Sequence, residues 1–213
     1  MVTEQFSCVI EYKEIKMPEF MERYHFEKKD MEMIISCVRF VCEVIRVEMI
    51  IGYEEKSAVC AVTLGEKYDK LSDVVAENLL LAYCVECVGM ELLSKAYERV
   101  NVHVYEKMGM WLGRYRFPEK DGIQDGLMKL QPEYIEWKNG MLHPAKSVVF
   151  TAQYVDDKKQ SGCEHCSLCG NVSCTFRKQE DVRNNLEKIS NTSAVGESVY
   201  SYGIHQIFGN NRK

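Results

Sequence analysis

The chain has 213 residues, 46% of them hydrophobic, which is enough for one substantial core. Its formal net charge is -5 and its basic residues are scattered, so no basic patch for nucleic acid is evident. The N-terminus, MVTEQFSCVIEYKEIK, carries charges where a signal peptide needs an apolar core, and the longest apolar run, LLLAYCV, is too short to span a membrane. We therefore expect a soluble cytoplasmic protein without a nucleic-acid or membrane partner.

The first half of the sequence predicts three helices and a strand. YKEIKMPEFMERYHF is typical of a short helix with Pro18 in its first turn. SAVCAVTLG predicts a buried strand that ends at Gly65. A long helix is expected over residues 72–97, and its nearly all-apolar middle should cross the centre of the domain. Between the short helix and the strand, a further helix is expected to start at Asp30, a candidate N-cap. Its apolar residues recur at helical spacing: Ile34, Ile35, Val38, Val41, Cys42 and Ile45.

Two small residues of the long helix, Ala82 and Gly89, lie one seven-residue step apart on the same face. Small side chains there permit a close neighbour, and ordinary helix packing is the favoured interpretation. A ligand that passes over this face is the alternative.

The second half predicts a strand in GMWLGRYRF, a loop and short element around Pro132, and a final strand in KSVVFTAQYV. Apolar residues occupy both faces of the final strand, so both faces should be covered. Strands and helices mix without a regular βαβ alternation and without a glycine-rich phosphate loop. These patterns favour an α+β fold with a mixed, mostly antiparallel sheet and long helices packed on it.

The composition changes at Asp156, where the hydrophilic stretch DDKKQSG begins. We expect an α+β core over residues 1–155, a linker and cysteine-rich segment over 156–178, and a polar C-terminal tail over 179–213. The tail also carries apolar residues that a purely solvated segment rarely contains, which suggests docking on the body or on another copy. These residues are Tyr200, Tyr202, Ile204, Ile207 and Phe208.

The ten cysteines fall into two groups. Six lie in apolar, regular segments and are expected to be reduced core residues: Cys8, Cys37, Cys42, Cys60, Cys84 and Cys87. The other four lie within CEHCSLCGNVSC, at a spacing that lets four thiolates reach one metal: Cys163, Cys166, Cys169 and Cys174. An iron–sulfur cluster, a zinc ion and reduced thiols without metal all remain open for this segment.

The segment AVTLGEKYDKLSDVVAENLLLAYCVECVGMELLSKAYERV resembles the strand, turn and long helix of the activation domain of vitamin B12-dependent methionine synthase and its stand-alone relatives. EIKMPEFMERYHFEKKDMEMIISCVRFVCEVI is similar to the opening helices of these relatives. LHPAKSVVFTAQY resembles their late Pro-x-x-Ser-Val strand, and CTFRK their tail. The resemblance covers about residues 10–178. It implies the curved, mostly antiparallel sheet of that domain, followed by a small cysteine-rich segment.

The resemblance also implies a function, because the family domain holds S-adenosylmethionine over oxidised cobalamin so that an electron and a methyl group restore methylcobalamin. The family's ligand loop is Arg-x-x-x-Gly-Tyr, and the matching stretch here is RYRFPEK with one inserted residue. Glu119 and Lys120 stand where Gly and Tyr belong, so we expect S-adenosylmethionine to bind weakly. The residues that the resemblance assigns to cofactor binding are Arg114, Tyr115, Arg116 and Pro118.

Other interpretations of this region stay open. RYRFPEKDG is also typical of a charged turn that leaves a strand, with Pro118 and Gly122 as turn formers. Trp111 and Tyr115 are expected to pack rather than to contact a corrin. The histidines stand alone in the sequence, and no Ser-His-Asp or Cys-His arrangement supports a hydrolase.

The leading hypothesis is a protein that reactivates, or docks on, a separate corrinoid protein, because the chain lacks the Asp-x-His-x-x-Gly signature for binding cobalamin itself. If it is active, its chemistry is of the methyltransferase type. The alternative is an electron-transfer or metal-sensing module centred on residues 163–174. A structural zinc-clipped adaptor is the third hypothesis, and the sequence leaves the oligomeric state open.

Overall fold

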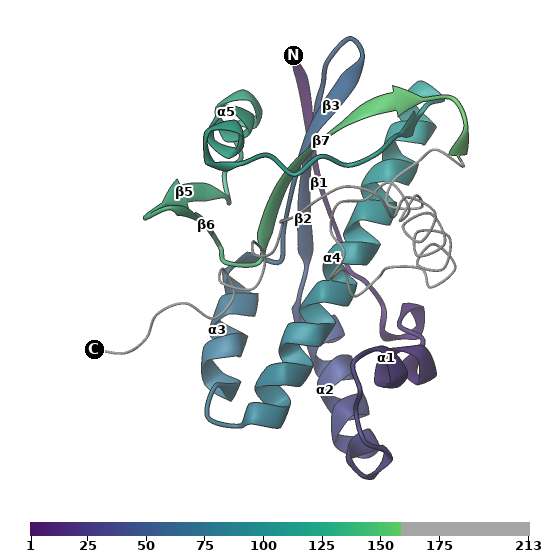
Figure 1. Cartoon of the computed structure of the whole chain (residues 1–213), viewed down its shortest axis with the longest axis vertical. Coiled ribbons are helices and arrows are strands. Elements are labelled where there is room, and N and C mark those ends of the chain that lie inside the picture. Colours follow the sequence, from purple (N-terminus) through teal and green to yellow (C-terminus); the bar gives the residue numbers. More distant parts are fainter. Residues whose placement is uncertain (159–213) are drawn as a thin grey trace, which may run out of the picture. The chain divides into compact units, whose positions relative to one another are not determined.

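A computed structural model describes residues 1–158 of the chain (Figure 1). The cysteine-rich segment and the polar tail that the sequence predicts lie outside these residues. The described part is an α+β unit with a curved five-stranded sheet in the order β1-β2-β3-β7-β4, and every neighbouring pair is antiparallel. The strands of this sheet are β1 (Val2–Cys8), β2 (Val47–Tyr53), β3 (Ser57–Thr63), β7 (Ser147–Val155) and β4 (Trp111–Leu112).

Helices cover the sheet on both sides, and α4 crosses one face while α5 and a hairpin lie on the other (Figure 1). The hairpin pairs β5 (Glu136–Lys138) with β6 (Met141–His143). Two 3-10 turns, η1 (Tyr12–Glu14) and η2 (Lys28–Asp30), flank the first helix. The helices are α1 (Met17–Arg23), α2 (Met31–Val44), α3 (Gly65–Val75), α4 (Leu79–Met108) and α5 (Lys120–Leu130).

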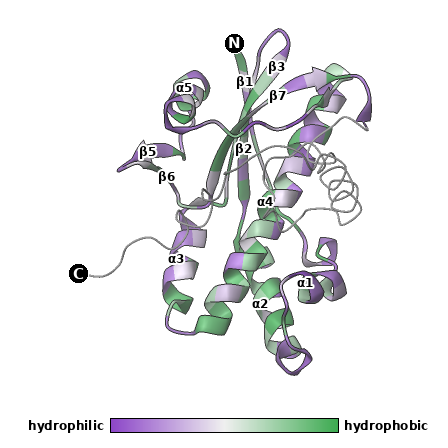
Figure 2. Ribbon diagram, in the orientation of Figure 1, coloured by the Kyte–Doolittle hydropathy of each residue, from purple (hydrophilic) through white to green (hydrophobic). Residues whose placement is uncertain are grey.

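The sheet separates two cores, as the alternation of side chains along each strand requires. In β7, Phe150 joins the larger core under α2 and α4, while the next residue toward the N-terminus, Val149, joins the smaller core under α5. In β2, Ile51 and Ile50 divide in the same way. Figure 2 shows hydrophobic residues along these central strands. The prediction that both faces of the final strand are covered is therefore confirmed.

Several local predictions are confirmed. Helix α1 carries Pro18 in its first turn, where the missing N–H costs nothing. Helix α2 follows Asp30 and buries the predicted apolar stripe except for Ile35, which is half-buried, and the Asp30 side chain makes no capping hydrogen bond. Strand β3 ends just before Gly65, whose φ of +75° suits glycine.

The prediction of a single helix over residues 72–97 is wrong, because this range contains the end of one helix and the start of the next. Helix α3 ends at Val75, and Asn78 then starts α4 by accepting a hydrogen bond from the Leu81 N–H at 3.1 Å. Helix α4 continues to Met108 and stops at Gly109, whose φ is +70°. Burial along α4 begins only after its first turn, since Leu79 is 84% exposed and Cys84 is the first buried residue of the helix.

Gly89 is a packing position, as the favoured interpretation held. A Cβ added there would lie 2.2 Å from the Tyr68 hydroxyl oxygen, so the glycine makes room for the Tyr68 ring from α3. The Tyr68 hydroxyl donates to the Val85 carbonyl at 2.8 Å and ties α3 to α4. The close neighbour is thus a side chain, and the partner small residue, Ala82, is only half-buried.

Three elements, β1, β2 and α5, were not predicted from the sequence. The strand expected in GMWLGRYRF contains only Trp111–Leu112 as a regular strand, followed by a single bridge between Arg116 and Thr151. Among residues 1–158, no helix combines the length and apolarity that a membrane span requires.

Candidate functional site

The predicted cofactor-binding residues lie in the segment 113–118, called here the arginine loop, which connects β4 to α5. Three backbone hydrogen bonds attach this loop to β7. The Gly113 N–H donates to the Gln153 carbonyl at 2.7 Å, and Arg116 exchanges bonds of 2.8 and 2.9 Å with Thr151. The loop is therefore a continuation of the sheet edge rather than a free turn.

The pairing of the loop contains a β-bulge. Leu112 pairs with Tyr154 and Arg116 with Thr151, so four steps on one strand oppose three on the other. The extra residue changes which side chains point inward, because Leu112 and Tyr115 both enter the larger core although they are three positions apart. In a regular strand, an odd separation would place them on opposite faces.

Tyr115 is the anchor of the arginine loop. Its side chain is buried, its ring centroid lies 4.7 Å from that of Phe150, and its hydroxyl donates to the Tyr97 carbonyl on α4 at 3.3 Å. The expectation that Tyr115 packs, rather than contacts a ligand directly, agrees with this position. Its burial fixes the loop between α4 and β7.

Arg114, Arg116 and Phe117 face outward. The Arg114 and Arg116 side chains are exposed, and Phe117 is 55% exposed with its ring 6.4 Å from that of Tyr97. Two exposed guanidinium groups can hold a carboxylate or phosphate, and an accessible aromatic ring in the same loop can stack against a flat group. Pro118 is half-buried and closes the loop before α5.

Glu119 and Lys120, which stand where the family loop has Gly and Tyr, lie at the start of α5. Glu119 is the residue before the helix, with φ of −73°, and Lys120 is the first helical residue. No left-handed backbone occurs at either position, so the loop takes a path that does not need glycine there. Gly122 lies within α5, which corrects its interpretation as a turn former. A Cβ there would approach that of Pro118 to 2.7 Å.

Trp111, at the start of β4, packs as expected. Its ring stacks on Tyr105 of α4 with centroids 4.1 Å apart, and the Lys158 ammonium lies 5.0 Å from the ring centroid. This contact lies where the described chain ends.

The four predicted metal ligands, Cys163, Cys166, Cys169 and Cys174, lie outside the described residues. Within residues 1–158, no group of histidine, cysteine or acidic side chains is arranged to hold a metal ion.

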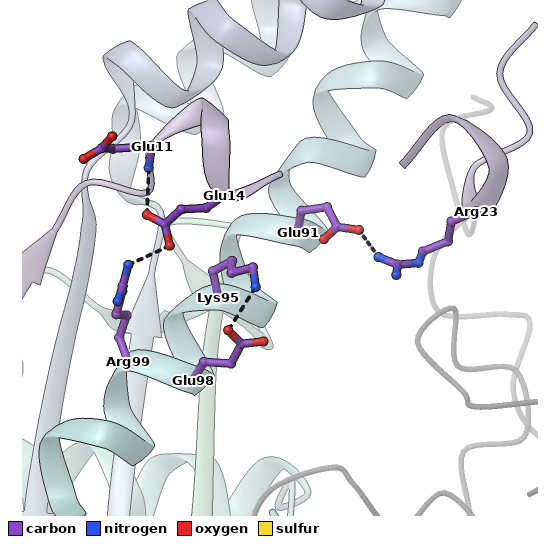
Figure 3. Close-up of polar contacts among 7 residues, drawn as sticks. All are labelled: Glu11, Glu14, Arg23, Glu91, Lys95, Glu98 and Arg99. Carbon is purple, nitrogen blue, oxygen red and sulfur yellow. Dashed lines mark hydrogen bonds and ion pairs between the residues drawn. The ribbon is translucent and has the colours of Figure 1, made fainter. Parts of the chain in front are cut away.

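An ion pair between Glu91 and Arg23, which was not predicted from the sequence, joins α4 to α1 (Figure 3). The Glu91 side chain is only 9% exposed, and the buried Tyr24 hydroxyl lies in the same region. Burial, followed by the Glu91 charge, raises the pKa of Tyr24 well above its usual range. A lone acid inside the apolar run VGMELL was the available signal, because a buried carboxylate requires a partner.

A second polar cluster surrounds Glu4 of β1. Its carboxylate accepts hydrogen bonds from Lys107 at 2.6 Å and from the Tyr53 hydroxyl at 3.2 Å, and His103 lies 3.2 Å away. These contacts, Lys107 first, lower the pKa of Glu4 to about 2. The cluster joins the sheet edge to the last turns of α4.

A shallow hollow lies between β1–β3 and the chain around Pro132. It encloses about 200 Å³ including open space, less than the roughly 300–1,000 Å³ of typical ligand pockets. Its lining supplies few polar groups that converge, so the hollow does not resemble a substrate site.

Comparison with known protein families finds no family model that matches this chain, and no curated protein matches it.

Proposed function

We propose that the chain is a stand-alone relative of the methionine synthase activation domain that supports reactivation of a separate corrinoid protein. The observation that carries the proposal is the bulged arginine loop, which presents Arg114, Arg116 and Phe117 on the surface beside Tyr97 of α4. This loop is the segment that resembles the family's ligand loop. A curved antiparallel sheet with a long helix packed on it is compatible with the same relationship.

The chemistry of the loop suits such a partner. A guanidinium group binds a carboxylate or phosphate with two parallel hydrogen bonds, and the exposed Phe117 ring offers a flat surface in the same loop. A reactivation complex must form and release, so we expect an interface at or below the usual ~1,200–2,000 Å² and affinity in the micromolar range.

Two forms of the proposal differ in the role of S-adenosylmethionine. In the first, the loop binds this methyl donor through its arginines. In the second, the loop only docks on the corrinoid protein. The regular backbone at Glu119 and the helix that starts at Lys120 favour weak binding of the methyl donor, because the close backbone approach that glycine permits is missing.

A titration calorimetry experiment tests the proposal. The full chain is titrated against corrinoid proteins from the same organism with cobalt in the Co(II) state, and we expect micromolar affinity. The variant Arg114→Glu/Arg116→Glu should weaken binding at least tenfold. The control Lys67→Glu/Lys138→Glu makes the same charge change at two other exposed positions and should bind normally.

Two results would overturn the corrinoid proposal. One is the absence of binding to every corrinoid protein tested. The other is an equal loss of affinity in both double variants, which would assign the effect to net charge rather than to the arginine loop. A separate titration with S-adenosylmethionine alone distinguishes the two forms: micromolar binding selects the first.

The cysteine spacing favours a second candidate function, an electron-transfer or metal-sensing module. Four thiols within twelve residues are typical of a metal centre. Metal analysis and visible absorption of protein purified without oxygen test this candidate. Iron with a visible absorption band that dithionite bleaches indicates an iron–sulfur cluster, and colourless protein that contains zinc indicates a structural zinc site. The absence of both metals would contradict it.

A further inference from the structure

Strand β1 forms one edge of the curved sheet, and among residues 1–158 no strand pairs with its outer side. Its inner side pairs with β2 without interruption, from Val2 opposite Tyr53 to Cys8 opposite Val47. An edge strand carries a row of outward backbone N–H and C=O groups that can pair with a further strand. Strand β1 is therefore a regular template for such pairing.

The two edges of the sheet differ. Proteins commonly block an edge with a short strand, a bulge, a proline or a lysine. The opposite edge is blocked in this way, since β4 contains only Trp111–Leu112 and the bulged arginine loop follows it. Strand β1 has seven residues and no bulge, proline, lysine or arginine. This contrast indicates that the β1 edge is used for pairing.

The one charged residue of β1 does not block its edge. The Glu4 carboxylate accepts a hydrogen bond from Lys107 of α4 at 2.6 Å, and Phe6 stacks on His103 of α4 with centroids 4.2 Å apart. These contacts are made by side chains on the α4 face of the sheet, so they do not use the backbone groups of the edge. The Glu4 charge is compensated within its own chain.

A second copy of this chain fits the edge, because β1 is complementary to itself. Two β1 strands related by a twofold axis perpendicular to the sheet pair antiparallel. Residues directly opposite each other in such a pair lie on the same face of the sheet, whereas neighbours along a strand alternate between faces. The axis must therefore bring one residue of β1 opposite its own copy.

Charge and length select that residue. Glu4 at the axis would place two carboxylates directly opposite each other, which is unfavourable. Phe6 at the axis would pair only positions 4–8 of β1. Gln5 at the axis pairs the whole strand, Val2–Cys8, over about 24 Å at about 3.4 Å per residue.

With Gln5 at the axis, most opposite residues match chemically. The pairs are Met1 with Val9, Val2 with Cys8, Thr3 with Ser7, Glu4 with Phe6, and Gln5 with its copy. Apolar residues meet at both ends, hydroxyls meet hydroxyls, and the two Gln5 amides can hydrogen-bond to each other. Val2 is 66% exposed and Met1 55% exposed in the single chain, so pairing would remove apolar surface from water.

We propose that the chain forms a twofold homodimer in which two β1 strands pair antiparallel with Gln5 at the axis. The two five-stranded sheets then become one continuous sheet. The arginine loop follows β4 at the other edge of each sheet, so pairing through β1 does not involve it. The homodimer is independent of the proposed corrinoid function, and either can fail without the other.

Sedimentation equilibrium of the full chain tests the homodimer. We expect a mass twice the 24.7 kDa of one chain. Gln5→Lys and Gln5→Glu each place two like charges opposite each other at the axis, so each should weaken dimerisation about tenfold or more at low ionic strength. An equimolar mixture of the two variants places lysine opposite glutamate and should restore dimerisation. This recovery distinguishes a pairing of position 5 with its own copy from other registers.

A matched variant controls the experiment. Gln153→Lys makes the same change at an exposed position of β7, a strand that is paired on both sides, and should leave dimerisation unchanged. Gln5 is exposed, so its variants should fold, which circular dichroism checks. A partner of another kind on the β1 edge would leave the pure chain monomeric. A monomer, a dimer that Gln5→Lys does not weaken, or a mixture that does not recover would each overturn the proposal.

Discussion

Replacing Gly89 by alanine should destabilise the protein, although alanine is the better helix former. The added Cβ would lie 2.2 Å from the Tyr68 hydroxyl oxygen and 2.6 Å from the ring carbon that bears it. Tyr68 is only 2% exposed, so its ring cannot turn toward solvent. It must shift within a packed core and weaken its hydrogen bond to the Val85 carbonyl.

The expected size follows from three opposing contributions. Alanine in place of glycine gains about 1 kcal/mol of helix propensity. Overpacking a filled site costs about 1–3 kcal/mol. An unsatisfied buried polar group left by the Tyr68–Val85 bond costs about 1–3 kcal/mol. These contributions sum to a net cost, so we expect Gly89→Ala to lower the free energy of unfolding by about 1–5 kcal/mol.

Urea unfolding followed by circular dichroism measures this change, with the midpoint compared at constant slope. Ala82→Gly, at the half-buried position seven residues earlier, calibrates the propensity contribution and should cost about 1 kcal/mol. In a Tyr68→Phe background, Gly89→Ala should cost about 1 kcal/mol less, because no hydroxyl remains to clash or to lose its bond. If Gly89→Ala raised the unfolding midpoint, the close packing of Tyr68 against α4 would be refuted.

The remaining predictions concern charge and the metal segment. Glu91→Gln should lower the free energy of unfolding by about 1–3 kcal/mol, because it removes the carboxylate charge that pairs with Arg23, and an equal effect in an Arg23→Gln background would contradict the pairing. The pKa of Glu4 is lowered from 4.5 to about 2 in the folded protein. Its ionised form therefore stabilises the fold fully at a pH above 4.5, and this stabilisation is lost as the pH falls through about 2. Glu4→Gln should flatten that part of a plot of urea midpoint against pH, and an unchanged plot would exclude the contribution. Cys166→Ser should reduce the metal content of anaerobically purified protein, and an unchanged metal content would exclude Cys166 as a ligand.

Local patterns were sufficient for part of the fold. The helical spacing from Asp30 predicted α2, and the short apolar runs predicted β3 and β7, because each has a period that one kind of secondary structure satisfies. The apolar residues on both faces of β7 also predicted two cores. In the site, the sequence identified Arg114 and Pro118 as loop residues, but it could not assign direction to their side chains.

Tertiary structure decided the rest. Strand β1 alternates polar and apolar residues only weakly, and it becomes a strand because β2 offers an unpaired edge. Helix α5 contains Gly122 and Gly126, which lower its helix propensity, yet Gly126 permits close packing on Val149, where a Cβ would lie 2.8 Å away. Such contacts depend on residues distant in the sequence, so no local pattern predicts them.

In the arginine loop too, the sequence and the tertiary structure determined different properties. Its composition came from the sequence, which placed two arginines and two aromatic residues in RYRF. Its orientation came from the bulge against β7, because the extra residue turns Tyr115 into the core while Arg114 and Arg116 remain exposed. The sequence alone determined which chemical groups are present, and only the pairing of two distant strands decided which of them reach the surface.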